Sequence, residues 1–315
     1  MPAGVAVPAA PAVAHAFWLR AGDGVRLRAA LWSGQAPRAT LLLFPGRTEF
    51  VEKYHPVAAH FAARGLAVLA IDWRGQGASD RLIADSTLGH VGDFAAYQRD
   101  VAALVAAADA LTLPGPRHLL AHSMGGAIGL RALHRGLAVD SAALSAPMWG
   151  IPYGALPDRL GMPLQALMSG LACLLGLGQR PIPGKAAPAA DPAHPDLPFA
   201  ENLLTSDPGW WRWAEDLSAA LPDLVIGAPS FAWGRAALAE CRALARLPMP
   251  GLPALITASG KEQLVSATAI RTGAACWPNA RLLDLPDARH EALFEQPRTR
   301  EPLLAAIARL IEENR

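Results

Sequence analysis

The stretch Leu119-Leu120-Ala121-His122-Ser123-Met124-Gly125-Gly126 is an apolar run that leads into a serine and then a pair of glycines. This pattern is typical of a buried strand that turns sharply into a helix and presents the serine Oγ at the apex of the turn. The glycines let the start of the helix pass close to neighbouring strands, where a Cβ would clash. Position 121, where glycine is usual, holds alanine, the next smallest residue. We therefore predict that Ser123 is a nucleophile at the end of a strand.

Apolar runs and amphipathic segments alternate on both sides of this serine. The apolar runs predict strands, and the segments 93–110 and 299–313 predict helices with one apolar face. This order favours an α/β fold, with a mostly parallel central sheet covered by helices on both faces. The alternation stops at residue 148 and resumes near 249. We therefore expect a core of residues 1–147 and 249–315, with a helical cap inserted at 148–248. The predicted strands are 17–21, 25–32, 39–44, 66–71, 117–122, 141–145, 253–258 and 280–285.

The inserted cap is rich in proline and aromatic residues. Five of the nine tryptophans lie within it, as does a proline-dense segment at 181–198. We expect these rings to form a small core of the cap, with some of them lining an apolar slot over Ser123. The apolar segment Met162–Gly178 is too interrupted for a membrane span. It predicts either a buried cap helix or a transient contact with a membrane surface.

Composition excludes several classes of protein. The formal net charge of the 315 residues is +1, so there is no basic field to attract nucleic acid. The three cysteines are widely spaced, which predicts no disulfide framework and no zinc site, and fits a reducing compartment. Met1–Ala16 has neither a basic start nor a continuous apolar core, so we expect no signal peptide. We expect the protein to lie in the cytoplasm. We also expect it to bind no metal.

A serine nucleophile needs a base that an acid holds in place. His290 follows the last predicted strand, and loops after the carboxyl ends of parallel strands share one edge of the sheet. Glu262 follows the preceding strand, so the order serine, acid, histidine suits this fold. Asp284 and Asp287 are alternative acids, close in sequence to His290. His122 is next to Ser123, but successive strand residues point to opposite faces, so we expect it to be a packed residue.

Two backbone N–H groups are expected to stabilise the oxyanion. One belongs to Met124, the residue after the nucleophile, and the other to Arg47, in the loop after strand 39–44. Gly46 allows that loop to turn inward. For the Arg47 side chain we expect an ion pair with Glu49.

Five segments together resemble the α/β-hydrolase superfamily. The match is closest to its lysophospholipase and monoglyceride lipase branch, which is grouped with serine aminopeptidase-like (S33) hydrolases. The resemblance implies a cap domain, no cofactor, and hydrolysis of acyl esters through an acyl-serine. Two positions depart from the family pattern, Ala121 for glycine and Glu262 for aspartate. The segments are 46–50, 72–79, 121–126, 260–265 and 290–291.

The leading expectation is a serine hydrolase with Ser123, Glu262 and His290 as catalytic residues. The resemblance and the tryptophan-rich cap favour a lysophospholipid or a monoacylglycerol as substrate. A proline-type aminopeptidase with the same three residues is an alternative, since acidic residues of the cap could hold a free amine. A catalytically silent binding protein of the same fold is a second alternative. The acidic residues are Asp207, Glu215, Asp216 and Asp223.

Overall fold

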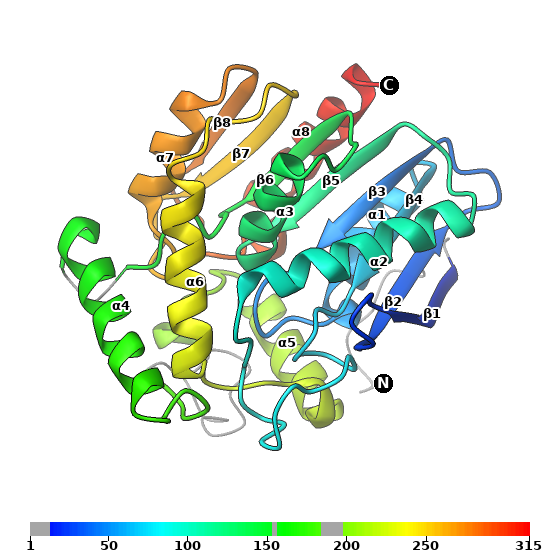
Figure 1. Ribbon diagram of the computed structural model, residues 1–315. Coiled ribbons are helices and arrows are strands. Elements are labelled where there is room, and N and C mark those ends of the chain that lie inside the picture. Colours follow the sequence, from blue (N-terminus) through cyan, green and yellow to red (C-terminus); the bar gives the residue numbers. More distant parts are fainter. Residues whose placement is uncertain (1–12, 153–155, 184–197) are drawn as a thin grey trace.

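A single eight-stranded sheet organises the molecule, and its strand order is β1-β2-β4-β3-β5-β6-β7-β8. The computed structural model describes residues 13–152, 156–183 and 198–315 (Figure 1). Residues 1–12 and most of the proline-dense segment, 184–197, lie outside the described residues. The strands are β1 (Val13–Arg20), β2 (Arg26–Ser33), β3 (Ala39–Phe44), β4 (Leu66–Ile71), β5 (Arg117–His122), β6 (Ser141–Ser145), β7 (Ala254–Ser259) and β8 (Ala280–Leu285).

The sheet is parallel from β4 to β8, and β2 runs antiparallel to both of its neighbours. Strands β3, β4, β6 and β7 are buried along their whole length, as continuous apolar runs in a two-sided sheet should be. The predicted fold class is confirmed. Five predicted strands have the bounds that the structure gives, and the other three are displaced at one or both ends.

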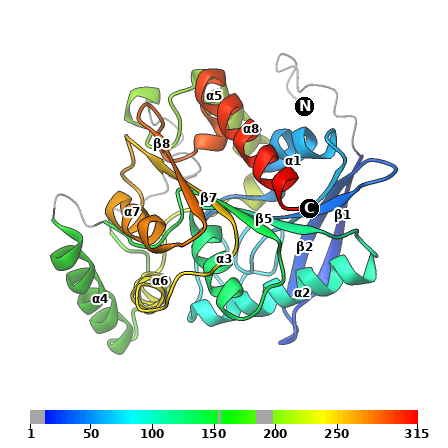
Figure 2. The same ribbon diagram turned by 90° about the horizontal axis from the view of Figure 1, so that it is seen from above.

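Helices cover both faces of the sheet (Figure 2). On one face α1 (His55–Ala62) and α8 (Pro297–Glu313) pack over the apolar side chains of Leu41, Leu43 and Val68. On the other face lie α2 (Tyr97–Ala110), α3 (Met124–His134) and α7 (Ala267–Cys276). Short 3-10 helices occupy Val51–Tyr54, Phe94–Ala96, Phe199–Glu201, Pro222–Leu224 and Ala292–Phe294.

The long connection from β6 to β7 adds no strand to the sheet within its described residues. It contains the helices α4 (Asp158–Leu174), α5 (Pro208–Ala220) and α6 (Phe231–Leu244). Helix α6 packs against α3, and α4 packs against α6 on its outer side (Figure 1). A groove between this connection and the sheet edge can therefore form above Ser123.

Helix α4 keeps a broad apolar face in contact with solvent. Leu174 and the adjoining Leu175 are 84% and 74% exposed, and seven further large apolar residues from 156 to 177 are also exposed. Of the two expectations for segment 162–178, burial is therefore wrong for its outer face. Within the described residues, no helix has both the length and the apolar character that a membrane crossing requires.

Candidate active site

Ser123 occupies the sharp turn between β5 and α3. Its backbone has φ +51° and ψ −118°, a strained conformation for a non-glycine residue. Its N–H donates to the Ser145 carbonyl at 3.0 Å, which fixes the turn against β6. Ala121 is accommodated because Gly129 of α3 lies opposite it, and even a Cβ added at Gly129 would be 3.6 Å from that of Ala121. Alanine at position 121 is therefore compatible with the turn.

A chain of hydrogen bonds links three side chains from three loops. His290 Nε2 lies 2.9 Å from Ser123 Oγ, and His290 Nδ1 lies 2.8 Å from Glu262 Oε2. The other oxygen of Glu262 accepts the N–H groups of residues 264 and 265 at 2.8 and 3.1 Å. Both alternative acids point elsewhere, because Asp284 pairs with Arg271 and Asp287 is exposed. The carboxylate that contacts the imidazole is that of Glu262.

The charges of this chain of side chains influence one another. Burial would lower the pKa of His290, but the carboxylates of Glu262, Glu291 and Glu49 together outweigh burial and raise it above its ordinary value. Burial likewise opposes ionisation of Glu262, yet the imidazole and two backbone N–H groups hold its pKa below the ordinary value. Glu262 is therefore ionised near neutral pH and favours the protonated imidazole that forms when His290 takes a proton.

The loop that carries His290 is hydrogen-bonded to the long connection from β6 to β7. The N–H groups of His290 and Glu291 donate to the carbonyls of Leu203 and Leu204 at 3.3 and 2.8 Å. Buried Asn202 shapes this segment, because its Oδ1 accepts two backbone N–H groups at 3.0 Å each. The connection from β6 to β7 thus helps to determine where the imidazole lies.

The loop after β3 brings Arg47 to the same edge. A Cβ built on Gly125 would overlap the carbonyl oxygens of Phe44 and Pro45, so α3 begins directly against this loop. The N–H of Met124 is in the first turn of α3, where helical acceptors are lacking. Our expectation for the Arg47 side chain is wrong. Its guanidinium donates to the Gly227 carbonyl and lies over the Trp233 ring at 5.2 Å, so it does not pair with Glu49.

Glu49 belongs instead to a buried charged cluster that sequence reasoning missed. Lys53 Nζ lies 3.1 Å from Glu49 Oε1 and also pairs with Glu291 Oε1. The other oxygen of Glu49 accepts the Tyr54 hydroxyl at 2.6 Å and the N–H of Gly46. The i, i+4 spacing of Glu49 and Lys53, beside an acidic residue next to His290, was the available signal.

His122 completes the cluster. Its Nδ1 lies 3.1 Å from the Ser145 carbonyl, and its ring centroid is 4.8 Å from that of His290. Ligand atoms of Glu49, His122 and Glu291 come within 4.8 Å of one another, as in a metal site. The Lys53 ammonium already contacts both carboxylates, so we interpret the cluster as an ion-pair network.

A cavity of about 180 Å³ opens onto Ser123 and His290. Its wall away from these residues is mainly apolar and is formed by residues of α6, of the loops in the β6–β7 connection and of the loop after β7, whereas α4 contributes the polar Gln165 and Ser169. The carboxylates in its lining, Glu49 and Glu291, are engaged by Lys53. Such a wall suits an acyl chain better than a free amine. The apolar lining residues are Met148, Ile151, Ile182, Leu204, Pro229, Trp233, Leu238, Leu264 and Val265.

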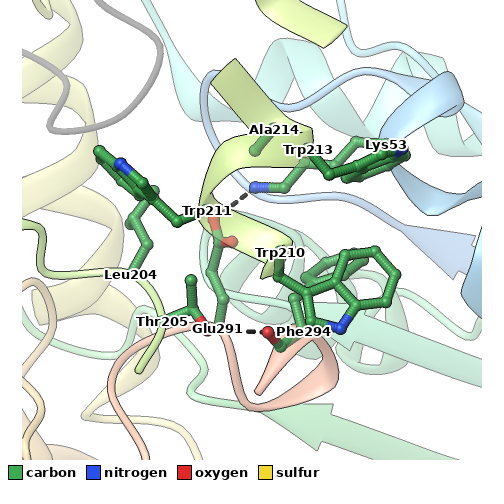
Figure 3. A pocket seen from close by; sticks show the side chains of 9 residues that line it. All are labelled: Lys53, Leu204, Thr205, Trp210, Trp211, Trp213, Ala214, Glu291 and Phe294. Atoms are coloured by element: carbon green, nitrogen blue, oxygen red, sulfur yellow. Dashed lines mark hydrogen bonds and ion pairs between the residues drawn. The ribbon is translucent and has the colours of Figure 1, made fainter. Parts of the chain in front are cut away.

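Of the five tryptophans in 148–248, Trp149 stacks on Trp277 of the core, and the other four divide between two places. Trp233 lines the cavity beside Ser123, whereas Trp210, Trp211 and Trp213 of α5 surround a much smaller pocket (Figure 3). That pocket holds about 10 Å³, room for about one water molecule. In Figure 3 a dashed line joins the Lys53 ammonium to Glu291 among these rings.

A parallel sheet with a strained serine between strand and helix, and a histidine and an acid at the same edge, defines an α/β-hydrolase. The chain belongs to the family described as "Serine aminopeptidase, S33", whose model matches residues 35–297.

Named relatives within this family are ester hydrolases. The chain is 31% identical to a probable lysophospholipase L2 from Haemophilus influenzae over 86% of this chain and 83% of that protein. It is 33% identical to lysophospholipase L2 from Escherichia coli over 90% of this chain and 84% of that protein. A soluble variant of monoglyceride lipase from Saccharomyces cerevisiae has the same fold, with a TM-score of 0.73, 16% identity, and coverage of 96% and 97% of the two chains. The chain is a serine hydrolase that cleaves carboxylic esters.

Proposed function

We propose that this protein hydrolyses single-chain lipid esters, a lysophospholipid or a monoacylglycerol, through an acyl-enzyme on Ser123. The observation that carries the proposal is the hydrogen-bonded series Glu262, His290 and Ser123, which opens onto a cavity with a mainly apolar wall. The relatives named for lysophospholipid hydrolysis support this choice of substrate.

The reaction follows from the positions of the three side chains. His290 Nε2 takes the proton of Ser123 Oγ as this oxygen attacks the acyl carbon, and Glu262 stabilises the imidazolium that forms. The N–H groups of Arg47 and Met124 stabilise the negative charge on the former carbonyl oxygen. His290 then gives its proton to the departing alcohol, which leaves an acyl-serine. Water, deprotonated by His290, releases the fatty acid and regenerates Ser123.

Residues 148–248 would serve as the cap, over a core of 1–147 and 249–315. Cap residues supply much of the apolar wall, including Ile182 and Trp233, so the acyl chain would lie between cap and core. The cap carboxylates that an aminopeptidase could use are absent from the described lining. Asp207, for example, caps α5 instead. This disfavours the aminopeptidase alternative.

A hydrolysis panel tests the proposed substrate class. It compares lysophospholipids, monoacylglycerols, short aryl esters and a prolyl anilide, for the wild type and for Ser123→Ala. We expect turnover of the single-chain lipids by the wild type, and fluorophosphonate labelling that Ser123→Ala abolishes. Equal labelling of both proteins would overturn the assignment of the nucleophile, and turnover of the anilide alone would overturn the substrate class.

The outer face of α4 is proposed to rest on a lipid surface from which such substrates are drawn. Exposed leucines continue along this helix, and contiguous apolar surface of this kind marks an interaction site. In a flotation experiment with phosphatidylcholine vesicles, the wild type should rise with the vesicles and Leu174→Glu/Leu175→Glu should stay in the bottom fraction. Leu111→Glu, at another exposed leucine, is the matched control. Unchanged flotation of the double variant would contradict this contact.

A further inference from the structure

Both loops that flank Ser123 carry a buried carboxylate, and one lysine contacts the two. Glu49 lies in the loop after β3 that contains Arg47, and Glu291 directly follows His290. The side chains of Glu49 and Glu291 are 3% and 6% exposed, so neither charge is solvated by bulk water. Lys53 Nζ lies 3.1 Å from Glu49 and pairs with Glu291 through the same ammonium group.

We propose that Lys53 is a positioning residue. Its ammonium ties the loop after β3 that contains Arg47 (the oxyanion loop) to the loop after β8 that contains His290 (the histidine loop), and offsets their negative charge beside His290. The inference rests on the proposed function of Ser123 and His290. Lys53 touches neither the reacting atoms nor, in this proposal, the substrate. Its effect would be transmitted through the two glutamates that it holds.

The connection from Lys53 to the oxyanion loop is short and fully bonded. Glu49 cannot turn away, because its second oxygen accepts the Tyr54 hydroxyl at 2.6 Å and the N–H of Gly46. The carbonyl of Gly46 accepts the Gln76 amide at 2.8 Å, so the two peptide planes on either side of the Gly46 Cα each have one bonded group. The next amide in the chain is that of Arg47. A shift of Lys53 therefore reaches an N–H group proposed to bind the oxyanion.

The opposite connection leads to the imidazole. Glu291 is adjacent to His290, and its own N–H is bound to the Leu204 carbonyl at 2.8 Å. The Lys53 ammonium lies 5.3 Å from the centroid of the Phe294 ring, and the side chains of Lys53 and Glu291 are 12% and 6% exposed (Figure 3). For an ion pair buried to this extent, the loss of one partner leaves a costly unpaired charge.

The charge balance around His290 depends on this ammonium. The groups that face the imidazole are Glu262 from the loop after β7, Glu291 beside it, Glu49, His122 of β5, and Lys53. Glu49 and Glu291 with Lys53 leave one net negative charge, and without Lys53 they leave two. Additional negative charge favours the imidazolium, so removal of Lys53 should raise the pKa of His290 further and delay its conversion to the active base as pH rises.

Lys53→Met tests the proposal, with Lys53→Arg as the conservative variant and Arg246→Met, at an exposed arginine of the α6–β7 connection, as the charge-removal control. The readouts are kcat and KM on an aryl ester, and the pH dependence of fluorophosphonate labelling. We expect Lys53→Met to lose about 10²-fold in kcat, as a small displacement of catalytic groups does, with KM little changed. The acid limb of labelling should move to higher pH, and Lys53→Arg should recover part of both effects.

The outcomes separate this inference from the proposed function. A wild type that fluorophosphonate does not label would overturn the function itself. If the wild type is labelled, and Lys53→Met has the same kcat and the same pH profile as the wild type, only the role of Lys53 would be overturned. If Lys53→Met does not fold, the double variant Lys53→Met/Glu291→Gln is used in its place, because it removes one charge of each sign. A low kcat with a near-normal acid limb would then support the proposal, and wild-type kcat would overturn it.

Discussion

Ser123 and His290 are 167 residues apart in the sequence, and Glu262 is 28 residues from His290, yet hydrogen bonds join all three. Each follows the carboxyl end of a strand, so the parallel sheet brings them to one edge. The serine conformation adds strain that the packing of α3 must hold. The hydrogen bonds among these three side chains therefore depend on how strands that are distant in the sequence are placed in the sheet.

Glu262→Gln tests which acid orients His290. The amide keeps the size of the side chain but removes the charge that stabilises the imidazolium. We expect kcat to fall by roughly 10³- to 10⁴-fold with little change in thermal stability. Asp284→Asn removes an exposed carboxylate near the same histidine, and should retain wild-type kcat. The result would contradict our assignment if Asp284→Asn were the impaired variant.

The pH dependence of hydrolysis should follow His290. Its pKa is raised above the ordinary 6.5, because Glu262, with Glu291 and Glu49, outweighs the opposing effect of burial. Only the neutral imidazole acts as base. We expect kcat/KM to rise with pH through a value above 6.5. The same raised pKa stabilises the fold below pH 6.5, and this contribution is lost as pH rises through the pKa of the folded state. A pH profile of kcat/KM measures the first effect, and an acid limb at or below pH 6 would contradict it.

The three hydrogen-bonded side chains of the proposed site could be predicted from the sequence, whereas the residues that hold them could not. Ser123, Glu262 and His290 stand at strand ends in the order that this fold uses, so topology alone brings them near one another. Lys53 lies in a short helix, and the direction of its side chain depends on packing. The same limit explains the Arg47 side chain, which bonds to a cap carbonyl that no local pattern indicates.

Among single elements, the start of α3 is packed very closely against its neighbours. Gly125 lies against the carbonyls of Phe44 and Pro45, where a Cβ has no space. Helix α4 differs, because one face packs on α6 and the other is exposed, so its sequence is constrained on one side only. Of the four strands buried on both faces, β3, β4 and β6 were predicted at their exact bounds, since their continuous apolar runs leave little ambiguity, and β7 was displaced by one residue. The hairpin strand β2 was also displaced by one residue, and β1 begins four residues before its predicted start.

Two glycine-to-alanine changes in helices should have opposite effects. Gly125→Ala must displace backbone carbonyls, which we expect to destabilise the protein by about 1–3 kcal/mol and to lower activity. Gly170→Ala in α4 meets nothing within 4 Å, so better helix propensity should stabilise it by up to about 1 kcal/mol. Chemical denaturation of both variants measures the difference. Equal stability of the two would mean that α3 shifts freely from β3.

Over the whole molecule, the long connection from β6 to β7 contacts the histidine loop. Asn202, Leu203 and Leu204 belong to this connection, and the carbonyls of Leu203 and Leu204 hold the N–H groups of His290 and Glu291. An insertion at 148–248 could be proposed from the sequence, because strand alternation stops at 148. Its contact with the histidine loop could not, since backbone hydrogen bonds between distant segments leave no pattern in one sequence. A change in the cap can therefore alter catalysis without touching the cavity wall.

Asn202→Ala tests this coupling. The buried amide accepts the N–H groups of Leu204 and Thr205 and donates to the Phe199 carbonyl, so its loss leaves backbone groups unpaired at about 1–3 kcal/mol. The carbonyls of Leu203 and Leu204 should then hold the histidine loop less firmly. We expect a lower melting temperature and a fluorophosphonate labelling rate reduced more than tenfold at a temperature where the variant is folded. Asn279→Ala, at an exposed asparagine that also donates to a carbonyl, is the matched control and should label at the wild-type rate. A folded Asn202→Ala that labels as fast as the wild type would show that the imidazole is held by the core alone.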